Sequence, residues 1–438
     1  MSSAWLGLRA VLEAAYGEAL KAVDPERLVA AALRPDHGRA GERLREAKRL
    51  HLLAVGKAAA PMARAAEQQL GARLVHSLAV VPQGYGMELS RTRVLEASHP
   101  VPDASSQVAA HAARELTSRV PPGECLLVLL SGGASSLLAL PAPGLALEEL
   151  AHTTSLLLAA GTPIESLNAV RKHLSAVAGG RLALCCTAGT IEVLLISDVP
   201  GDAVDVIGSG PFAADSSSYA DALDCVRERG LLAQLSPTVR DDLLEGVAGR
   251  RPETPAPGDP RLQGVSHTLL ASNATAREAA CVALRTRGWR CFEFPEPFRG
   301  EASRVGAALA SLARATRDGL GHCFVAGGES RVRVRGSGRG GRSQELALAA
   351  ALKLQGLDEC AILAAGTDGR DGPTDAAGAY ADGGTLTRGR ALGLDAARAL
   401  EDNDSHGYFS REGGVFRTGP TRTNVMDLVL LAVGGPGS

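Results

Sequence analysis

The chain has no long apolar runs and almost no net charge, and each absence excludes a class of protein. No stretch of its 438 residues approaches the roughly 20 consecutive apolar residues that a membrane-spanning helix needs. Lys and Arg together number 46 and Asp and Glu 48, which gives a formal net charge of −2. This balance lacks the basic excess of nucleic-acid-binding proteins. We therefore expect neither a membrane nor a nucleic acid as a partner.

The eight cysteines form no C-x-x-C pair, the spacing on which zinc ribbons and thioredoxin-like sites depend. Most of them lie inside apolar runs, which predicts reduced, buried thiols in a cytoplasmic protein. A signal peptide is not expected, because charged residues recur at helical spacing through the apolar residues 4–23. That pattern predicts an amphipathic surface helix.

Three familiar motifs are also missing. The chain contains neither the G-x-x-x-x-G-K-[ST] phosphate loop nor the G-x-S-x-G nucleophile elbow. No segment has the ligand spacing of an EF-hand, and no group of His and Cys has metal-binding spacing. These absences argue against an α/β-hydrolase and a calcium-binding loop.

Short apolar runs, each followed by a glycine-rich or polar turn and a helical pattern, recur along the chain. Continuous apolar strands that alternate with helices are typical of parallel sheets covered by helices. The alternating residues 331–335, RVRVR, predict a half-exposed antiparallel strand, so a second sheet should be mixed. The apolar runs occupy residues 50–55, 126–130, 191–196, 269–271, 323–326 and 361–365.

A proline-rich segment without apolar periodicity, residues 249–265, predicts a linker between two domains. The N-terminal domain, residues 1–248, is expected to contain a Rossmann-like parallel sheet. The C-terminal domain, residues 266–438, is expected to contain the mixed sheet. We predict that both are α/β/α layered domains.

Two features after the first apolar strands suit phosphate groups, because ligands bind at the carboxyl ends of parallel strands. In the loop Ser131–Ser136, SGGASS, glycines let backbone N–H groups converge on an anion and serines add hydroxyl donors. A tight turn with a serine cap is the alternative. Lys57 directly follows a strand-end glycine, where an ammonium group suits a β- or γ-phosphate. An exposed lysine is the alternative there.

The segment Gly336–Gly341 contains G-x-G-x-x-G, but its context argues against a dinucleotide site. The preceding RVRVR strand is charged, and no acidic residue ends the next apolar strand. Arg342 follows on the first turn of a helix, beside free N–H groups. A guanidinium group there suits a carboxylate or a phosphoryl group. A solvated arginine paired with Glu345 is the alternative.

Acidic and polar side chains follow other strands. Asp198, Asp202 and Asp368 stand among glycines at strand ends and suit Mg²⁺, with ordinary Asp-Gly turns as the alternative. Asn168 and Arg171 share one face of a helix, although a polar helix face is commonly just solvated. His99 and His406 are interpreted as structural rather than catalytic.

Taken together, these segments resemble the class II glycerate 2-kinases, also called the MOFRL family. The resemblance runs in the family's order from residue 54 to residue 428, across nearly the whole chain. The segments that carry it are AVGKAA (54–59), SHPVPD (98–103), LLSGGASS (129–136), LNAVRKHLS (167–175), ISDVPGD (196–202), IGSGP (207–211), ASNATA (271–276), GGES (327–330), GSGRGGRSQELAL (336–348), GTDGRDGPTDAAGA (366–379), NDSH (403–406) and TGPTRTNVMDL (418–428).

The resemblance implies ATP- and Mg²⁺-dependent phosphorylation of D-glycerate at its C2 hydroxyl, giving 2-phosphoglycerate. It also implies an active site in a cleft between two α/β domains. Catalysis falls to Lys57 and Arg342, and substrate binding to Asn168, Arg171 and Asn273. Asp198, Asp202 and Asp368 remain the expected metal ligands. Phosphate and nucleotide binding is assigned to Ser131, Gly132, Gly133, Ser135, Ser136, Gly327, Gly328 and Glu329.

The chain departs from the family pattern at four positions. Ala134 stands where the phosphate loop usually has glycine, and Ser343 stands for asparagine in GGRSQE. Ala178 replaces a common lysine. Arg422 in TGPTRTN occupies a usual glycine position, and this change bears most on the substrate contacts.

Two other functions are compatible with parts of the pattern. One is an NAD(P)-dependent hydroxypyruvate reductase, against which the context of G-x-G-x-x-G argues. The other is a non-catalytic binder of sugar acids or nucleotides, against which Lys57, Arg342 and the acidic loops argue. The sequence leaves open whether the protein forms a homodimer.

Overall fold

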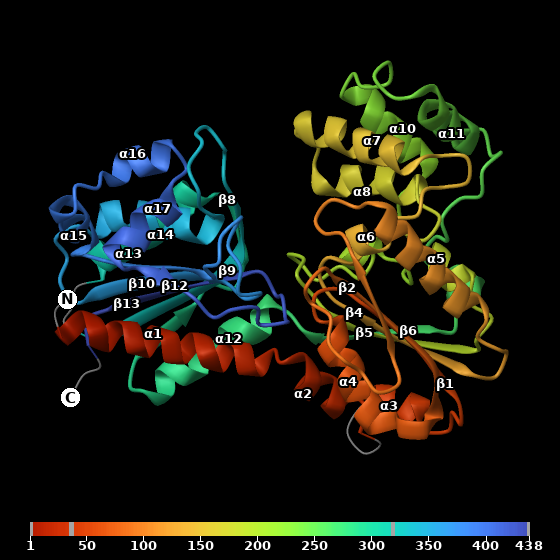
Figure 1. The fold of residues 1–438 in the computed structure, drawn as a ribbon, viewed down its shortest axis with the longest axis horizontal. Coiled ribbons are helices and arrows are strands. Elements are labelled where there is room, and N and C mark those ends of the chain that lie inside the picture. Colours follow the sequence, from red (N-terminus) through yellow and green to blue (C-terminus); the bar gives the residue numbers. More distant parts are fainter. Residues whose placement is uncertain (1–2, 35–38, 317–319, 436–438) are drawn as a thin grey trace. The chain divides into compact units, whose positions relative to one another are not determined.

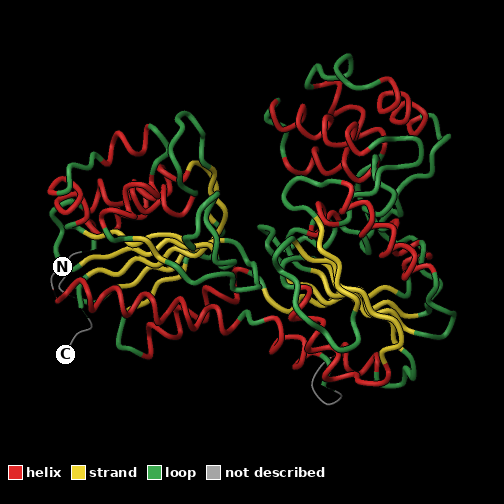
Figure 2. Tube along the Cα trace, viewed as in Figure 1, coloured by secondary structure: helices red, strands yellow, loops and turns green. Residues whose placement is uncertain are grey.

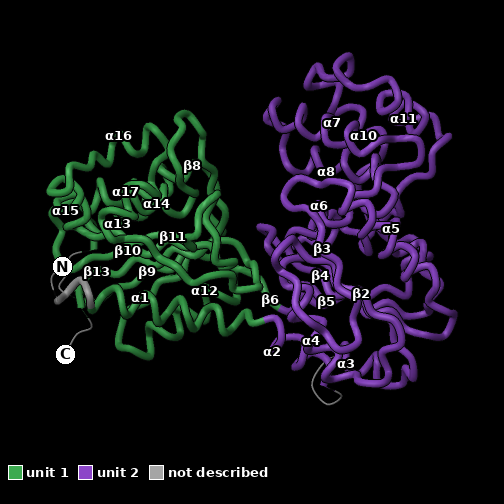
Figure 3. The backbone as a smooth tube through the Cα atoms, in the orientation of Figure 1, with its two compact units in different colours: residues 1–24, 271–438 green, residues 25–270 purple. Residues whose placement is uncertain are grey.

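The computed structural model describes residues 3–34, 39–316 and 320–435. It consists of two compact units (Figure 3). Residues 25–270 form one, called here the parallel-sheet unit. Residues 1–24 and 271–438 form the other, called the mixed-sheet unit. In the described residues, no helix combines the length and apolar character needed to cross a membrane. All eight cysteines are free thiols.

The parallel-sheet unit is built on a six-stranded sheet in the order β3-β2-β1-β4-β5-β6. β1 pairs in parallel with both β2 and β4, and β4 pairs in parallel with β5. The predicted Rossmann-like parallel sheet is therefore confirmed. β1 and β4 are buried along their whole length, as their continuous apolar sequences predict. The strands are β1 (Leu50–Val55), β2 (Leu74–Pro82), β3 (Arg93–Ala97), β4 (Cys125–Leu130), β5 (Thr190–Ile196) and β6 (Val265–Ala271).

Helices cover this sheet and form an additional helical layer. Four of them, α7, α8, α10 and α11, pack around a core of their own that includes Leu157, Val170 and Leu223 (Figures 1 and 2). The helices are α2 (Pro25–Ala32), α3 (Arg39–Leu44), α4 (Ala59–Leu70), α5 (Ala104–Ser118), α6 (Ala134–Leu137), α7 (Leu147–Ala159), α8 (Ile164–His173), α9 (Arg181–Leu184), α10 (Tyr219–Glu228) and α11 (Pro237–Val247).

The mixed-sheet unit has the strand order β12-β11-β10-β13-β9-β7, and β8 pairs with β9. β7 and β8 run parallel to β9, whereas β9, β13, β10, β11 and β12 pair antiparallel. This confirms the predicted mixed sheet. The strands are β7 (Arg290–Glu293), β8 (Phe298–Glu301), β9 (His322–Arg331), β10 (Cys360–Gly366), β11 (Gly378–Asp382), β12 (Val415–Phe416) and β13 (Asp427–Val433).

Helices lie on both faces of the mixed sheet. α1 and α12 lie on one face, and α13 and α14 lie on the other (Figure 1). The helices are α1 (Ser3–Ala22), α12 (Asn273–Thr286), α13 (Ala302–Ala315), α14 (Arg342–Leu354), α15 (Thr385–Ala391), α16 (Ala396–Glu401) and α17 (Ser405–Glu412). α1 is the predicted amphipathic helix. It buries Leu12, Ala15 and Ala19, and Tyr16 Oη donates to the Gly366 carbonyl at 2.7 Å.

The predicted linker, residues 249–265, is not a connection between the units. It folds back onto the parallel-sheet unit, where Pro255 O accepts a hydrogen bond from Asp215 N at 2.8 Å and Thr254 is buried. The chain instead passes between the units at residues 24/25 and 270/271. The proline content correctly indicated an irregular segment, but a backbone hydrogen bond and the burial of Thr254 tie that segment to the unit.

The predicted antiparallel strand over residues 331–335 is also wrong. β9 ends at Arg331, and its last four residues pair in parallel with β8. Beyond it the Asn403 side-chain oxygen accepts hydrogen bonds from Arg335 N and Gly336 N. The Asn403 side chain therefore accepts hydrogen bonds from two backbone N–H groups that would otherwise bond to a neighbouring strand.

Candidate functional site

The parallel sheet brings Lys57 and the loop Ser131–Ser136 together. Lys57 follows β1, the loop follows β4, and the strand order reverses between these two neighbours. Ligands in such sheets bind in the crevice at this reversal. Lys57 N donates to Gly132 O at 2.9 Å, and Ala58 N donates to Ser131 Oγ at 3.0 Å. The structure thus joins the two phosphate-binding features that the sequence predicted separately.

Glycines keep this contact tight. A Cβ at Gly56, where φ is 124°, would collide with Ser131. A Cβ at Gly133, where φ is 92°, would lie 3.0 Å from His99 Cδ2 and 3.8 Å from Lys57 Cγ. The His99 ring and the Lys57 side chain therefore both flank Gly133. His99 belongs to the SHPVPD motif and was interpreted as structural from the sequence. The structure places it beside the loop Ser131–Ser136.

The serines of the loop differ in what they offer a ligand. Ser131 is fully buried, and its hydroxyl already accepts a hydrogen bond from the chain after Lys57. Ser136 Oγ donates to Gly133 O at 3.1 Å. Ser135 is different, because its hydroxyl meets the hydroxyl of Ser209 at 2.8 Å and lines a cavity. Ser209 has a left-handed φ of 62°, a conformation that non-glycine residues adopt at a cost.

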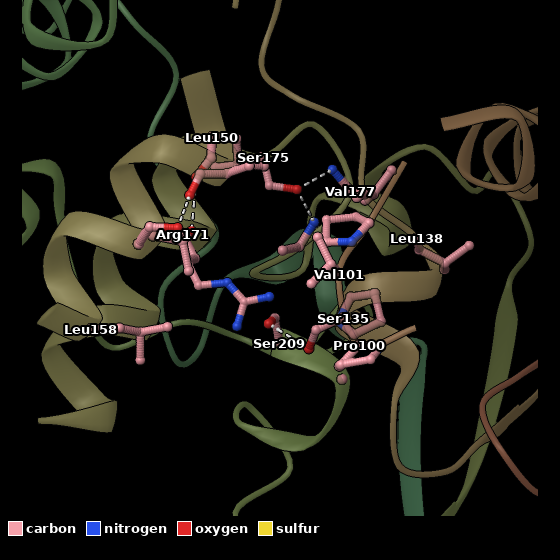
Figure 4. A pocket seen from close by; sticks show the side chains of 18 residues that line it. Pro100, Val101, Ser135, Leu138, Leu150, Leu158, Arg171, Ser175, Val177 and Ser209 are labelled. Carbon is pink, nitrogen blue, oxygen red and sulfur yellow. Dashed lines mark hydrogen bonds between the residues drawn. The ribbon is translucent and has the colours of Figure 1, made fainter. Parts of the chain in front are cut away.

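The cavity has a volume of about 290 Å³ and contains Arg171 from α8. The Arg171 guanidinium group extends toward Ser209 and Ser135 (Figure 4). Burial lowers the pKa of Arg171, and its guanidinium group has no ion pair among the described residues. A buried cation without a protein anion is costly unless a ligand supplies the negative charge. The cavity is therefore suited to a small anion.

Two polar residues near Arg171, Ser175 and Asn168, differ in their relation to the cavity. Ser175 lies just beyond the end of α8, lines the cavity, and accepts hydrogen bonds from the backbone N–H groups of Val177 and Ala178 at 3.2 and 3.1 Å. Asn168 is buried on α8 and is not part of the cavity lining. Its role in substrate binding remains a prediction.

The turn after β5 carries Asp198 and Asp202, both partly exposed. Two carboxylates on one turn are suitable ligands for Mg²⁺, which commonly binds one or two carboxylates together with phosphate oxygens and water. No group of three or more His, Cys, Asp or Glu side chains with metal-binding geometry occurs in the part of the chain that the structure describes. Asp368, the third predicted ligand, belongs to the mixed-sheet unit.

A buried ion-pair network that the sequence analysis missed adjoins this turn. Lys172 Nζ, buried at the end of α8, lies 3.1 Å from both Asp205 and Asp215. Burial raises the pKa of Asp215, but hydrogen bonds from Ser217 and the charge of Lys172 outweigh it, so the net shift is downward. The network connects α8 to the segment after β5.

In the mixed-sheet unit, Arg342 is held by two carboxylates. Its Nε and Nη2 donate to the two oxygens of Asp427 at 2.6 and 2.9 Å, and Nη1 donates to Glu329. Asp427 begins β13 and is 3% exposed. Burial raises the pKa of Asp427 to about 7 against the opposing charge of Arg342. The motif NVMDL contained this residue, but nothing in its spacing indicated the partner.

The N-terminus of α14 is also occupied. The Asp371 carboxylate accepts hydrogen bonds from Ser343 N at 2.9 Å and from Gln344 N at 2.8 Å. The free N–H groups expected beside Arg342 are therefore already bound. The alternative pairing of Arg342 with Glu345 is wrong as well, because Glu345 accepts a hydrogen bond from Asn403 Nδ2 at 3.1 Å.

The glycines predicted to bind nucleotide in this unit also allow close packing, and their role in nucleotide binding stays a prediction. Gly327 and Gly328 lie inside β9 rather than after it. A Cβ on Gly327 would collide with the Asn273 side chain, and one on Gly328 would collide with the Phe298 backbone. Glu329, on the same strand, is the ion-pair partner of Arg342. The three residues thus support the strand and the arginine.

Asn273 has a positioning role in the structure. Its Nδ2 donates to Val425 O at 2.7 Å and to Asp427 O at 3.1 Å, while its Oδ1 is buried without a hydrogen-bond partner. The side chain therefore fixes the backbone that enters β13. Its predicted contact with substrate stays a prediction.

Arg422 adopts a left-handed backbone conformation, with φ of 59°. That conformation costs an ordinary residue about 1–2 kcal/mol but is open to glycine, which the family pattern has here. We expect Arg422→Gly to raise the free energy of unfolding by about 0.5–1 kcal/mol, after the entropy that glycine gains in the unfolded chain. Arg422→Ala is the control, because it removes the side chain without relieving the backbone. Urea denaturation measures both, and equal stability of the two variants would contradict the backbone explanation.

The comparisons with known proteins agree with this fold and show the family. Residues 11–244 match the family model described as "Domain of unknown function (DUF4147)", and residues 322–427 match the MOFRL family. The glycerate 2-kinase of Pyrococcus horikoshii is 37% identical over 98% of this chain and 97% of its own. An Agrobacterium vitis protein described as a candidate hydroxypyruvate reductase is 35% identical over 97% of this chain and 94% of its own.

The crystal structure of a glycerate kinase from Thermotoga maritima superposes with a TM-score of 0.83 at 35% sequence identity. The match covers 98% of this chain and 99% of that one. The fold and these matches place the chain among the glycerate kinase enzymes. The chain belongs to the glycerate 2-kinase family, whose members combine the DUF4147 and MOFRL parts. The family implies ATP as the phosphoryl donor.

Proposed function

We propose that this protein transfers the γ-phosphoryl group of ATP to the C2 hydroxyl of D-glycerate, forming 2-phosphoglycerate and ADP. One observation carries the proposal. The Lys57 contact with Ser131–Ser136 adjoins a cavity that holds the unpaired cation Arg171. A phosphate-binding crevice and a carboxylate-binding cavity thus meet through Ser135, which belongs to both.

The chemistry divides between these residues. Arg171 binds the carboxylate of glycerate, whose charge compensates the buried guanidinium group. The C2 oxygen forms a bond to the γ-phosphorus while the bond from that phosphorus to ADP breaks, and the hydroxyl proton leaves to a base. Lys57 neutralises negative charge on the transferring group. Bound Mg²⁺, held by Asp198 and Asp202, would supply charge neutralisation at the ATP phosphates.

A coupled assay tests the activity and the position of phosphorylation together. D-glycerate and ATP are incubated with the protein, enolase and pyruvate kinase, without phosphoglycerate mutase. Enolase accepts only 2-phosphoglycerate, so pyruvate formation supports the proposal. Pyruvate that appears only after mutase is added shows phosphorylation at C3 instead. Oxidation of NADH by hydroxypyruvate without ATP would establish the reductase alternative.

Arg171→Ala is expected to raise KM for glycerate by about 10- to 100-fold, since a charged hydrogen-bonding partner contributes about 1.5–3 kcal/mol. The variant should also be as stable as the parent, because it removes an uncompensated buried cation. Steady-state kinetics and thermal melting measure the two effects. Arg227→Ala, at an exposed site on α10, is the matched control. An unchanged KM in Arg171→Ala refutes the carboxylate assignment.

A further inference from the structure

A second cavity lies at the other end of the parallel sheet. It has a volume of about 430 Å³ and is formed by the first residues of β1, β2 and β3 and the last turns of α5. His51 stands near the start of β1, whereas Lys57 follows the end of that strand. Six residues of extended chain span roughly 20 Å. The second cavity is therefore separate from the catalytic crevice within the same unit.

The charges that line this cavity are mainly positive. The guanidinium groups of Arg91 and Arg93 have neither a hydrogen bond nor an ion pair among the described residues. Arg119 pairs with Glu115 at 2.7 Å, and this glutamate is the acidic residue of the lining. Two unpaired arginines in one concave site favour an anion with more than one negative charge.

His51 gives an independent indication of a ligand. Its side chain is 2% exposed, and its Nε2 is bound to Glu124 Oε2 at 2.7 Å. Its Nδ1 is buried and has no hydrogen-bond partner, although the residue lines the cavity. Buried polar atoms in folded proteins are nearly always paired. Because a carboxylate only accepts hydrogen bonds, Nε2 carries the hydrogen toward Glu124, and Nδ1 is the ring atom left for a polar group of a ligand in the cavity.

We propose that this cavity binds a small phosphorylated molecule carrying at least two negative charges, at a site distinct from the catalytic one. Guanidinium groups bind phosphate oxygens in a bidentate manner, and several such oxygens are needed to engage Arg91 and Arg93 together. The cavity is larger than inorganic phosphate requires, which favours a phosphorylated organic molecule. The proposed binding does not depend on the function proposed above.

Pyrophosphate is a suitable probe for calorimetric titration of the full-length protein. The double variant Arg91→Gln/Arg93→Gln should lose one binding event or weaken it at least tenfold. Arg227→Gln/Arg240→Gln, which removes the same charge from exposed positions on α10 and α11, should bind as the parent does. Circular dichroism and thermal melting show whether each double variant keeps the fold. Identical binding in the Arg91/Arg93 variant, or equal loss in the control, overturns the proposal.

A second measurement on the unmodified sequence makes the test independent of variant folding. Phenylglyoxal modifies accessible arginines, and peptide mass spectrometry locates the modified positions. Pyrophosphate should protect Arg91 and Arg93 while leaving Arg227 and Arg240 reactive. Unchanged modification of Arg91 and Arg93 at saturating pyrophosphate refutes the site.

Discussion

Lys57→Ala is expected to lower kcat by about 100- to 1,000-fold, the usual cost of losing one group that stabilises transition-state charge. Lys57 lies beside Gly133 at the reversal of the parallel sheet, and its backbone N–H holds the phosphate loop. The substitution removes the ammonium group but leaves this backbone contact in place. KM for glycerate should therefore change little, because Arg171 is the residue proposed to bind that substrate. The coupled assay with saturating ATP measures both constants.

The control for this variant is Lys21→Ala, which removes an exposed lysine near the end of α1. Its kinetics should equal those of the parent. Circular dichroism and thermal melting should show that Lys57→Ala keeps the fold. A kcat within threefold of the parent would exclude Lys57 from charge stabilisation, whatever the effect on KM.

Arg342→Ala is expected to lower the free energy of unfolding by about 3–5 kcal/mol, the range for a buried ion pair that loses one partner. The reason is that Asp427, 3% exposed, would remain in the interior without its bidentate partner. Denaturant unfolding measures the loss. The double variant Arg342→Met/Asp427→Leu removes both charges and should recover most of the stability. A double variant as unstable as Arg342→Ala would contradict the ion-pair explanation.

The loss should depend on pH in a defined direction. Burial raises the pKa of Asp427 to about 7 in the folded protein, against an ordinary value of about 4 in the unfolded chain. A carboxyl group of this kind favours the folded state most at pH values below about 4, and that contribution disappears as the pH rises through about 7. In Arg342→Ala, protonation removes the isolated buried charge. The destabilisation should therefore be smaller near pH 5 than near pH 8.

The sequence predicted the strands with continuous apolar runs and the chemistry at their ends. All six runs are strands in the structure, including β1, β4 and β10. Lys57 and Ser131–Ser136 were predictable because each follows such a run, and the geometry of parallel sheets brings neighbouring strand ends together. A local sequence pattern is enough to predict a contact when the strand order of the sheet brings the two residues together.

The partners of Arg342 were not predictable in this way. Asp427 is 85 positions from Arg342 in the sequence. Asp371, which binds the N-terminus of α14, is 28 positions from Ser343. Glycine patterns were similarly ambiguous, because the same residue permits a close ligand and a close neighbouring chain. At Gly327 the neighbour is Asn273, so close packing alone is enough to require the glycine.

The position of α1 has a consequence for how the protein is made. The residues of the parallel-sheet unit are continuous in sequence, whereas the mixed-sheet unit combines the first 24 residues with residues 271–438. Tyr16 donates to Gly366, 350 positions later. During synthesis from the N-terminus, the parallel-sheet unit can fold as soon as it leaves the ribosome. The first helix must wait, with its apolar face uncovered, until almost the entire polypeptide has been translated.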